Sequence, residues 1–320
     1  MASQIGPESR PDSTIHIIAD RGDARLRLDQ VLIRRVTTVS ALSRRLAQQW
    51  IKAGMVAVDG RTACRPAAAV HERSQIVVSI PPETRLREHP RAQERELDIV
   101  YEDEWLMAIN KPAGLVVHPS YKNKSGTVLN AVLWHVRNRE EARPGLVSRL
   151  DKDTSGLVLV ALNSNVHAQI QRDGEQGRLI KEYLALVRAT PRPARGRITT
   201  PLARDPHDRR RMIPASDGAA SETRYETVSK ADGVSLLRCQ LVTGRTHQIR
   251  VHLASRGWPI VGDSLYGVAD DAVSRQALHA WRLVLPHPVS RETLEIQSGV
   301  PDDLPLMGRL FSLGVERGAG

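Results

Sequence analysis

The stretch Leu-Val-Ser-Arg-Leu-Asp-Lys-Asp-Thr-Ser-Gly-Leu-Val-Leu-Val, residues 146–160, sets a short polar turn between two apolar runs. The second run, from Leu157 onward, alternates leucine and valine without a polar residue and predicts a buried strand. Asp151 lies in the turn just ahead of that strand, two residues after Arg149. An aspartate at such a place is most often a turn or capping residue. Beside a cation at a strand end, it is also well placed to act as a nucleophile.

A second informative stretch, residues 241–253, reads Leu-Val-Thr-Gly-Arg-Thr-His-Gln-Ile-Arg-Val-His-Leu. A strand should lead into the Thr-Gly turn, and a short helix should begin near Thr246 with Ile249 on its apolar face. Arg245 lies at the start of this helix, where free N–H groups and the helix dipole favour an anion, and Arg250 follows about one turn later. At least one arginine can therefore point into a cleft. The alternative is a helix packed through its apolar stripe, with two surface arginines.

Tyr183 belongs to a third stretch, Lys-Glu-Tyr-Leu-Ala-Leu-Val at residues 181–187, which predicts another strand. Its ring can face either a site or the hydrophobic core. Core packing is the default for a tyrosine in such a strand.

A small module is predicted ahead of a larger domain. The module has two amphipathic helical patterns followed by small strands, and its second helix carries Arg44, Arg45 and Lys52 on the polar side. In the larger domain, strand-like runs outnumber helical ones and the connections are short, which predicts an α+β fold with a mixed, largely antiparallel sheet and flanking helices. The predicted limits are 1–22 for a flexible segment with a short strand at 15–17, 23–82 for the module, 83–96 for a linker, 97–312 for the larger domain and 313–320 for a tail.

The composition favours a polyanionic partner. The 320 residues include 46 Lys and Arg against 36 Asp and Glu, a formal charge of +10, and basic surfaces bind phosphates by releasing counterions. The polar N-terminus and the lack of long apolar segments favour a cytoplasmic protein away from membranes. The two cysteines, Cys64 and Cys239, lie far apart, and metal-ligand or phosphate-loop motifs are missing, so we expect no metal and no nucleotide cofactor.

Taken together, these stretches resemble the RluA-type family of RNA pseudouridine synthases, from about Leu97 to Pro301. Asn-Lys-Pro-Ala-Gly at residues 110–114 and Leu-His-Ala at residues 278–280 fit the same family. The N-terminal module resembles the small RNA-binding module named after ribosomal protein S-four. One departure is Ser148, which stands where the family string usually has a histidine.

The resemblance implies a cofactor-free isomerase that flips a uridine out of RNA and converts it to pseudouridine. It implies that Asp151 is the catalytic aspartate, that Arg245 pairs with it, and that Tyr183 stacks on the target base and can take a proton. Whether Arg245 or its neighbour Arg250 makes the pair stays open. Contacts to RNA are expected from Arg149, which would fill the gap left by the base, from the apolar wall Ile249, and from Arg250, Arg44, Arg45 and Lys52.

Two other classes of function compete with this one. The first is a catalytically silent RNA-binding or ribosome-assembly protein. The second is a nucleoside or glycoside hydrolase, which would need a second carboxylate, and Asp153 is the only nearby candidate. By analogy, large-subunit ribosomal RNA is the preferred substrate, transfer RNA is the alternative, and a monomer is expected.

Overall fold

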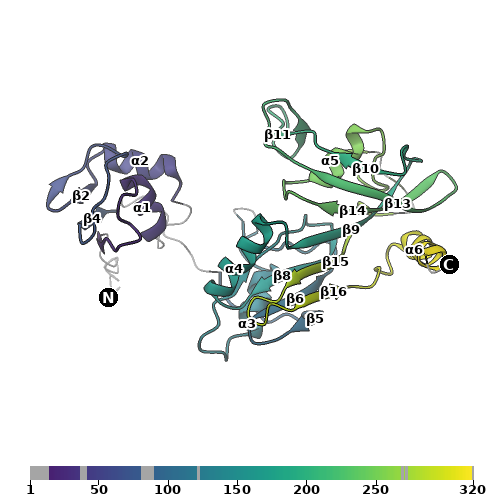
Figure 1. Cartoon of the computed structure of the whole chain (residues 1–320), viewed down its shortest axis with the longest axis horizontal. Coiled ribbons are helices and arrows are strands. Elements are labelled where there is room, and N and C mark those ends of the chain that lie inside the picture. Colours follow the sequence, from purple (N-terminus) through teal and green to yellow (C-terminus); the bar gives the residue numbers. More distant parts are fainter. Residues whose placement is uncertain are drawn as a thin grey trace, which may run out of the picture. The chain divides into compact units, whose positions relative to one another are not determined.

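The computed structural model describes residues 14–36, 42–80, 90–120, 123–267, 270 and 273–318. The chain forms two compact units, Met1–His89 and Pro90–Gly320 (Figure 1). The boundary between the two units falls within the linker expected over residues 83–96. Residues 83–89 of that linker and residues 1–13 lie outside the described part of the chain. Within the described ranges, no helix is long and apolar enough to cross a membrane.

The N-terminal unit packs two helices against a four-stranded sheet with the order β1-β4-β2-β3. Its elements are β1 (Thr14–Ile18), α1 (Leu28–Arg35), α2 (Arg44–Lys52), β2 (Val56–Val58), β3 (Arg61–Thr62) and β4 (Gln75–Ser79). Both predicted helices are confirmed, and α2 begins where the Ser43 hydroxyl accepts the Leu46 N–H. The short strand expected at residues 15–17 is confirmed as β1, so the expected flexible segment is ordered from Thr14 onward.

The larger unit is built on a ten-stranded sheet with the path β10-β13-β14-β9-β15-β8-β6-β5, to which β16 and β7 add at β15 and β8. The strands are β5 (Ile99–Glu102), β6 (Leu106–Lys111), β7 (Gly145–Leu146), β8 (Ser155–Ala161), β9 (Ile180–Val187), β10 (Arg195–Ile198), β13 (Thr223–Ala231), β14 (Val234–Leu241), β15 (Leu278–Pro286) and β16 (Thr293–Gln297). Among these pairings only β15 with β8 is parallel. The predicted mixed, largely antiparallel sheet is therefore confirmed.

Helices flank this sheet, and a separate hairpin projects from it. The helices are α3 (Val128–His135), α4 (Ser164–Glu175), α5 (Gln248–Ser255) and α6 (Pro305–Gly318), and the hairpin pairs β11 (Leu202–Arg204) with β12 (Met212–Pro214). The prediction that a tail begins at residue 313 is wrong, because α6 continues to Gly318. The helix forms here because Met307 and Leu310 bury their side chains in the core beneath β9 and β14.

The predicted buried strand after Asp151 is β8, and every residue of it is buried. Gly156 is its second residue and adopts a φ of +107° against the parallel neighbour β15. A Cβ atom at this position would lie 2.1 Å from the carbonyl oxygen of Ala280, so only glycine allows the two strands to approach this closely. Because β8 and β15 run in parallel, the turn ahead of β8 and the segment ahead of β15 meet at one edge of the sheet.

Candidate active site

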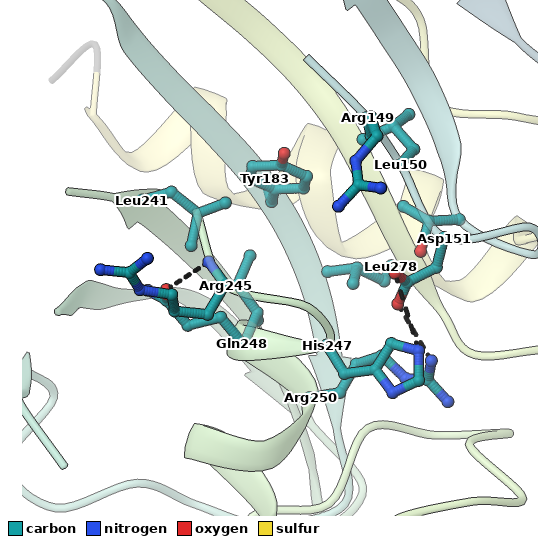
Figure 2. A pocket seen from close by; sticks show the side chains of 12 residues that line it. Arg149, Leu150, Asp151, Tyr183, Leu241, Arg245, His247, Gln248, Arg250 and Leu278 are labelled. Carbon is teal, nitrogen blue, oxygen red and sulfur yellow. Dashed lines mark hydrogen bonds and ion pairs between the residues drawn. The ribbon is translucent and has the colours of Figure 1, made fainter. Parts of the chain in front are cut away.

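Three segments that are distant in the sequence meet where β8 and β15 begin. The turn at 149–154 supplies one wall, Tyr183 of β9 supplies another, and residues 241–250 complete the site. They line a small hollow that opens to solvent (Figure 2). Its lining consists of Arg149, Leu150, Asp151, Thr154, Tyr183, Leu241, Arg245, His247, Gln248, Ile249, Arg250 and Leu278.

The Asp151 carboxylate is held by one arginine from α5. Arg250 Nη1 donates to Asp151 Oδ2 at 3.0 Å, and its Nε and Nη2 donate to the buried Asp263 at 2.7 and 2.9 Å. Asp263 also accepts the N–H groups of Leu265 and Tyr266. Burial acts to lower the pKa of Arg250, but the hydrogen bonds and charges of Asp263 and Asp151 outweigh it and raise that pKa. A permanently charged guanidinium therefore bridges the two carboxylates.

The arginine that pairs with Asp151 is thus Arg250, and the expected pairing with Arg245 is wrong. The helix begins at Gln248, two residues later than predicted, because His247 adopts a left-handed conformation with φ +54°. Arg245 consequently lies in the loop before the helix, where its Nε donates to the carbonyl oxygen of Ala220 at 3.0 Å and its side chain points away from Asp151 (Figure 2). Arg250, with only 7% of its surface exposed, is buried behind the carboxylate rather than presented to RNA.

Tyr183 belongs to the hydrophobic core and also lines the hollow. Only 6% of the residue is exposed. Burial, followed by the negative charge of Asp151, raises the pKa of the phenol, so the side chain stays neutral. Ile249, Leu241 and Leu278 add apolar surface next to the ring. The hollow therefore offers a flat aromatic face and an apolar wall beside a carboxylate, which suits a planar base attached to a sugar.

Arg149 is exposed at the mouth of the hollow, and its guanidinium points toward the space between Tyr183 and Asp151 (Figure 2). Within the described part of the chain, it has no ion-pair partner. Ser148, the residue in place of the family histidine, accepts the N–H of Leu159 at 3.3 Å and so supports the strand rather than the site.

Two further side chains, His247 and Tyr266, support the site and were not predicted from the sequence. His247 Nε2 lies 3.9 Å from Asp151 Oδ1, and its Nδ1 lies 2.8 Å from the hydroxyl of Tyr266. That hydroxyl accepts the N–H of Met212 on β12, so the hairpin is tied to the site. Burial lowers the pKa of His247, which favours a neutral imidazole. His247 belongs to the stretch at residues 241–253 that the sequence singles out, but no spacing rule tells which of its side chains face Asp151.

Basic side chains lie on the β11–β12 hairpin next to the site and on α2 of the N-terminal unit. The hairpin carries Arg204 and Arg211, with the run Asp-Arg-Arg-Arg at 208–211 in its loop. In the N-terminal unit, Arg45 and Lys52 are exposed on α2. Arg44 is exposed too, but its Nε also binds the buried Asp29 at 3.3 Å. No group of three or more histidine, cysteine, aspartate or glutamate side chains is arranged to hold a metal ion in the part that the structure covers.

The chain matches two family models, RNA pseudouridylate synthase over residues 105–255 and the S4 domain over residues 26–76. It is 39% identical over 304 residues to ribosomal large subunit pseudouridine synthase D of Nitrosomonas europaea, covering 92% of this chain and 86% of the relative. It is also 35% identical to an uncharacterized RNA pseudouridine synthase, YlyB, of Bacillus subtilis, covering 91% of this chain and 95% of the relative.

A solved structure agrees with these relatives. Human RNA pseudouridylate synthase domain containing 1 superposes with a TM-score of 0.54 at 29% identity, covering 66% of this chain and 86% of that one. The relatives and the family models confirm the resemblance inferred from the Asp151 turn, and with it an isomerase that acts on RNA. The chain belongs to the family of RNA pseudouridylate synthases and carries an S4 domain ahead of its catalytic domain.

Proposed function

We propose that the protein isomerises specific uridines of large-subunit ribosomal RNA and that Asp151 is the residue that starts the reaction. The single observation that carries the assignment is the Asp151 carboxylate, which is bound to Arg250 through one oxygen and lines the same hollow as Tyr183. The substrate follows from the relatives named ribosomal large subunit pseudouridine synthase D. Transfer RNA is the second candidate substrate.

The reaction breaks the bond between ribose and the base nitrogen, turns the uracil and rejoins it through carbon. No atoms are gained and no electrons leave, so the chain's own side chains suffice. The carboxylate either attacks the ribose or removes a ribose proton, and both routes need it ionised. Arg250 binds Oδ2 with a charged donor and leaves Oδ1 available to the substrate. His247, next to Oδ1, would contribute a neutral hydrogen-bond donor or acceptor.

The target uridine must leave the RNA stack before it can enter the hollow, which costs a few kcal/mol. Stacking on Tyr183 and contact with Ile249 offset part of that cost. Arg149, exposed at the mouth, is placed to occupy the gap that the base leaves. Arg45 and Lys52 of the S4 domain, together with the hairpin arginines, would bind phosphates and position the RNA without reading its bases. We further infer a monomer that works in the cytoplasm.

The geometry weighs against hydrolysis. A hydrolase needs two carboxylates free to act on the same bond. Of the two acidic residues near Asp151, Asp263 is buried against Arg250, and Asp153 is not part of the hollow's lining. The site also keeps the full set of Asp151, Tyr183 and an arginine partner, which a silent RNA-binding protein would have no reason to retain.

RNA tritiated at the uracil 5-carbon tests the proposal, because isomerisation releases this label to water. The unchanged protein should release label from a large-subunit ribosomal RNA transcript, and Asp151→Ala and Asp151→Asn should release none while still binding the RNA. A transfer RNA transcript serves as the comparison substrate. Substantial release by Asp151→Asn would refute the assignment, and free uracil in the products would indicate a hydrolase.

A further inference from the structure

A chain of polar groups connects the hairpin of β11 and β12 to the Asp151 carboxylate. The N–H of Met212 on β12 donates to the hydroxyl of Tyr266 at 2.8 Å. The same hydroxyl lies 2.8 Å from Nδ1 of His247. The other ring nitrogen, Nε2, lies 3.9 Å from Asp151 Oδ1, the oxygen that Arg250 does not bind (Figure 2). Tyr266 thus contacts His247 through the ring nitrogen that does not face the carboxylate.

The hydrogen-bonding capacity of these groups determines where the imidazole proton lies. A neutral imidazole carries one proton, on either Nδ1 or Nε2. Burial lowers the pKa of His247 and raises that of Tyr266, so at neutral pH the ring is neutral and the hydroxyl keeps its proton. Among the residues that the structure describes, the hydroxyl has two hydrogen-bonding contacts, the Met212 N–H that it accepts and Nδ1. Its own proton is therefore donated to Nδ1, which must be the unprotonated nitrogen.

The charge next to Nε2 favours the same form of the ring. With the proton on Nε2, the imidazole presents an N–H group to the negative Asp151. With the proton on Nδ1, it would present a lone pair to that carboxylate, and the phenol proton of Tyr266 would have no acceptor. One contact at each ring nitrogen therefore selects the same tautomer. The 3.9 Å separation is too long for a hydrogen bond, but such contacts commonly shorten when the substrate binds.

The ring of Tyr266 is itself held in place. The guanidinium carbons of Arg250 and Arg211 lie 5.1 and 5.5 Å from its centroid, and the His247 ring meets it edge-on at 5.6 Å. The N–H of Tyr266 donates to Asp263, the carboxylate that also binds Arg250. Tyr266 does not line the hollow, so its hydroxyl can act on the reaction only through His247.

We propose that Tyr266 is a positioning residue that keeps the proton of His247 on Nε2, directed at Oδ1 of Asp151. The Nε2–H group binds this oxygen as the carboxylate meets the ribose and so holds it in one orientation. A hydrogen bond at one ring nitrogen commonly decides in this way what the other nitrogen of a functional histidine can do. The inference rests on the proposed role of Asp151 and adds a donor for the oxygen that Arg250 leaves unbound.

The experiment compares Tyr266→Phe with the unchanged protein and with Tyr225→Phe. Tyr225 is a matched control, because its ring also meets an aromatic ring edge-on, that of Trp258, and its hydroxyl donates to the carbonyl oxygen of Pro193 at 3.4 Å, away from the hollow. Nitrogen NMR of protein labelled in its histidine rings shows which nitrogen of His247 is protonated. Spectra are recorded at about pH 8, above the ordinary histidine pKa, and His247→Gln identifies the signal.

Three further quantities are measured on the same proteins: the single-turnover rate of tritium release at saturating enzyme, the dissociation constant for the RNA, and the melting temperature. The unchanged protein and Tyr225→Phe should carry the His247 proton on Nε2. In Tyr266→Phe the proton should be shared between the two nitrogens, and the rate should fall by about 10- to 100-fold, as for other lost orienting hydrogen bonds. RNA affinity should stay within about twofold, because the hydroxyl does not line the hollow.

A double variant separates this role from a merely structural one. In a His247→Gln background, Tyr266→Phe should cost no further rate, because no imidazole tautomer is left to select. An equal loss of rate with and without His247 would overturn the proposal, since the hydroxyl would then serve the fold alone. So would a proton on Nδ1 in the unchanged protein, or a Tyr266→Phe rate per folded molecule within about threefold of the unchanged rate.

Asp151→Asn in the same assay distinguishes the two hypotheses. If it stays active, the assignment of Asp151 is wrong, and with it the role of the donor. If it is inactive while Tyr266→Phe keeps the full rate, only the positioning role of Tyr266 is wrong.

Discussion

Arg250 contacts Asp151 through a single nitrogen, at 3.0 Å, and commits its Nε and other terminal nitrogen to Asp263. The catalytic candidate therefore shares its cation with a second carboxylate that is buried and cannot take part in the reaction. Asp263 fixes the plane of the guanidinium, and that plane sets the direction in which Asp151 is held.

The first prediction follows from this chain of charges. Asp263→Asn keeps the size of the side chain but removes the charge that orients Arg250, so tritium release should fall by about 10- to 100-fold. Arg250→Met should abolish release. Arg245→Met is the control, because Arg245 binds the carbonyl of Ala220 and not Asp151, and it should keep most of the single-turnover rate. Equal losses for Arg245→Met and Arg250→Met would contradict the pairing.

The second prediction concerns the aromatic wall. Tyr183→Leu removes the flat face on which the flipped base is proposed to stack, whereas Tyr183→Phe keeps the ring and removes only the hydroxyl. We expect the leucine variant to lose more single-turnover activity than the phenylalanine variant, by roughly the 1–3 kcal/mol of one base-stacking contact. The two rates are compared on the same RNA. A larger loss for phenylalanine would make the hydroxyl, rather than stacking, the main contribution.

The third prediction is a pH dependence that originates in His247. Burial lowers the pKa of this imidazole, so it is neutral at neutral pH and gains a proton only below the ordinary histidine range of about 6.5. Asp151, Arg250, Asp263 and Arg204 all act on it electrostatically, and Tyr266 binds its Nδ1. The single-turnover rate should therefore stay level around neutral pH and fall in acid. In His247→Gln the fall in rate at acid pH should shift along the pH axis. An unchanged pH–rate profile would show that His247 does not cause this fall.

The fourth prediction concerns RNA affinity. Replacing Arg45 and Lys52 by glutamate reverses two exposed charges on α2 of the S4 domain. The dissociation constant for RNA should rise, and its dependence on salt should become less steep, because fewer phosphates are neutralised. The rate at saturating enzyme should not change. Lys230→Glu, an exposed residue of β13, is the matched charge control. Unchanged affinity and salt slope in the double variant would show that α2 does not bind the RNA.

The fifth prediction concerns stability and pH. The pKa of Lys111 is about 7 in the folded protein and near its ordinary value of 10.5 when unfolded. Between these values the unfolded chain binds more protons, so the contribution of Lys111 to stability rises with pH across this window. Below about pH 7 the lysine is charged in both states, and the full free-energy cost of burying its charge lowers the stability of the folded protein. The melting temperature of Lys111→Met, relative to the unchanged protein, should therefore be most favourable at about pH 6 and less so at about pH 9.

The sequence predicts the strands and helices of this protein better than it predicts the side-chain contacts within the site. The run after Asp151 could be identified as β8 because a buried strand needs an uninterrupted apolar stretch. Tyr183 could be placed on a strand for the same kind of reason. The partner of Asp151 could not be chosen from the sequence, because it depends on the left-handed conformation of His247, which delays the start of α5. No periodicity reports such a conformation in a residue other than glycine.

Contacts between segments that are distant in the chain could not be predicted from the sequence either. Arg250 and Asp263 meet across a connection without regular structure, and Lys111 reaches Lys152 from a strand far away in the chain. Such pairs depend on how the sheet brings its edges together. The sequence could therefore mark the stretches that matter and leave undecided which side chains within them touch.

The tight approach at Gly156 has a consequence for where this enzyme is most easily disabled. Strands β8 and β15 are matched at only two positions, and Asp151 precedes one strand while Tyr183 pairs with the other. Asp151 and Tyr183, the proposed catalytic acid and stacking residue, are thus attached to different strands of this short parallel pair. A single methyl group added at Gly156 must push β8 and β15 apart, because it would collide with the backbone of Ala280. A substitution at a residue that does not line the hollow would in this way separate the two side chains that we propose act on the same nucleoside.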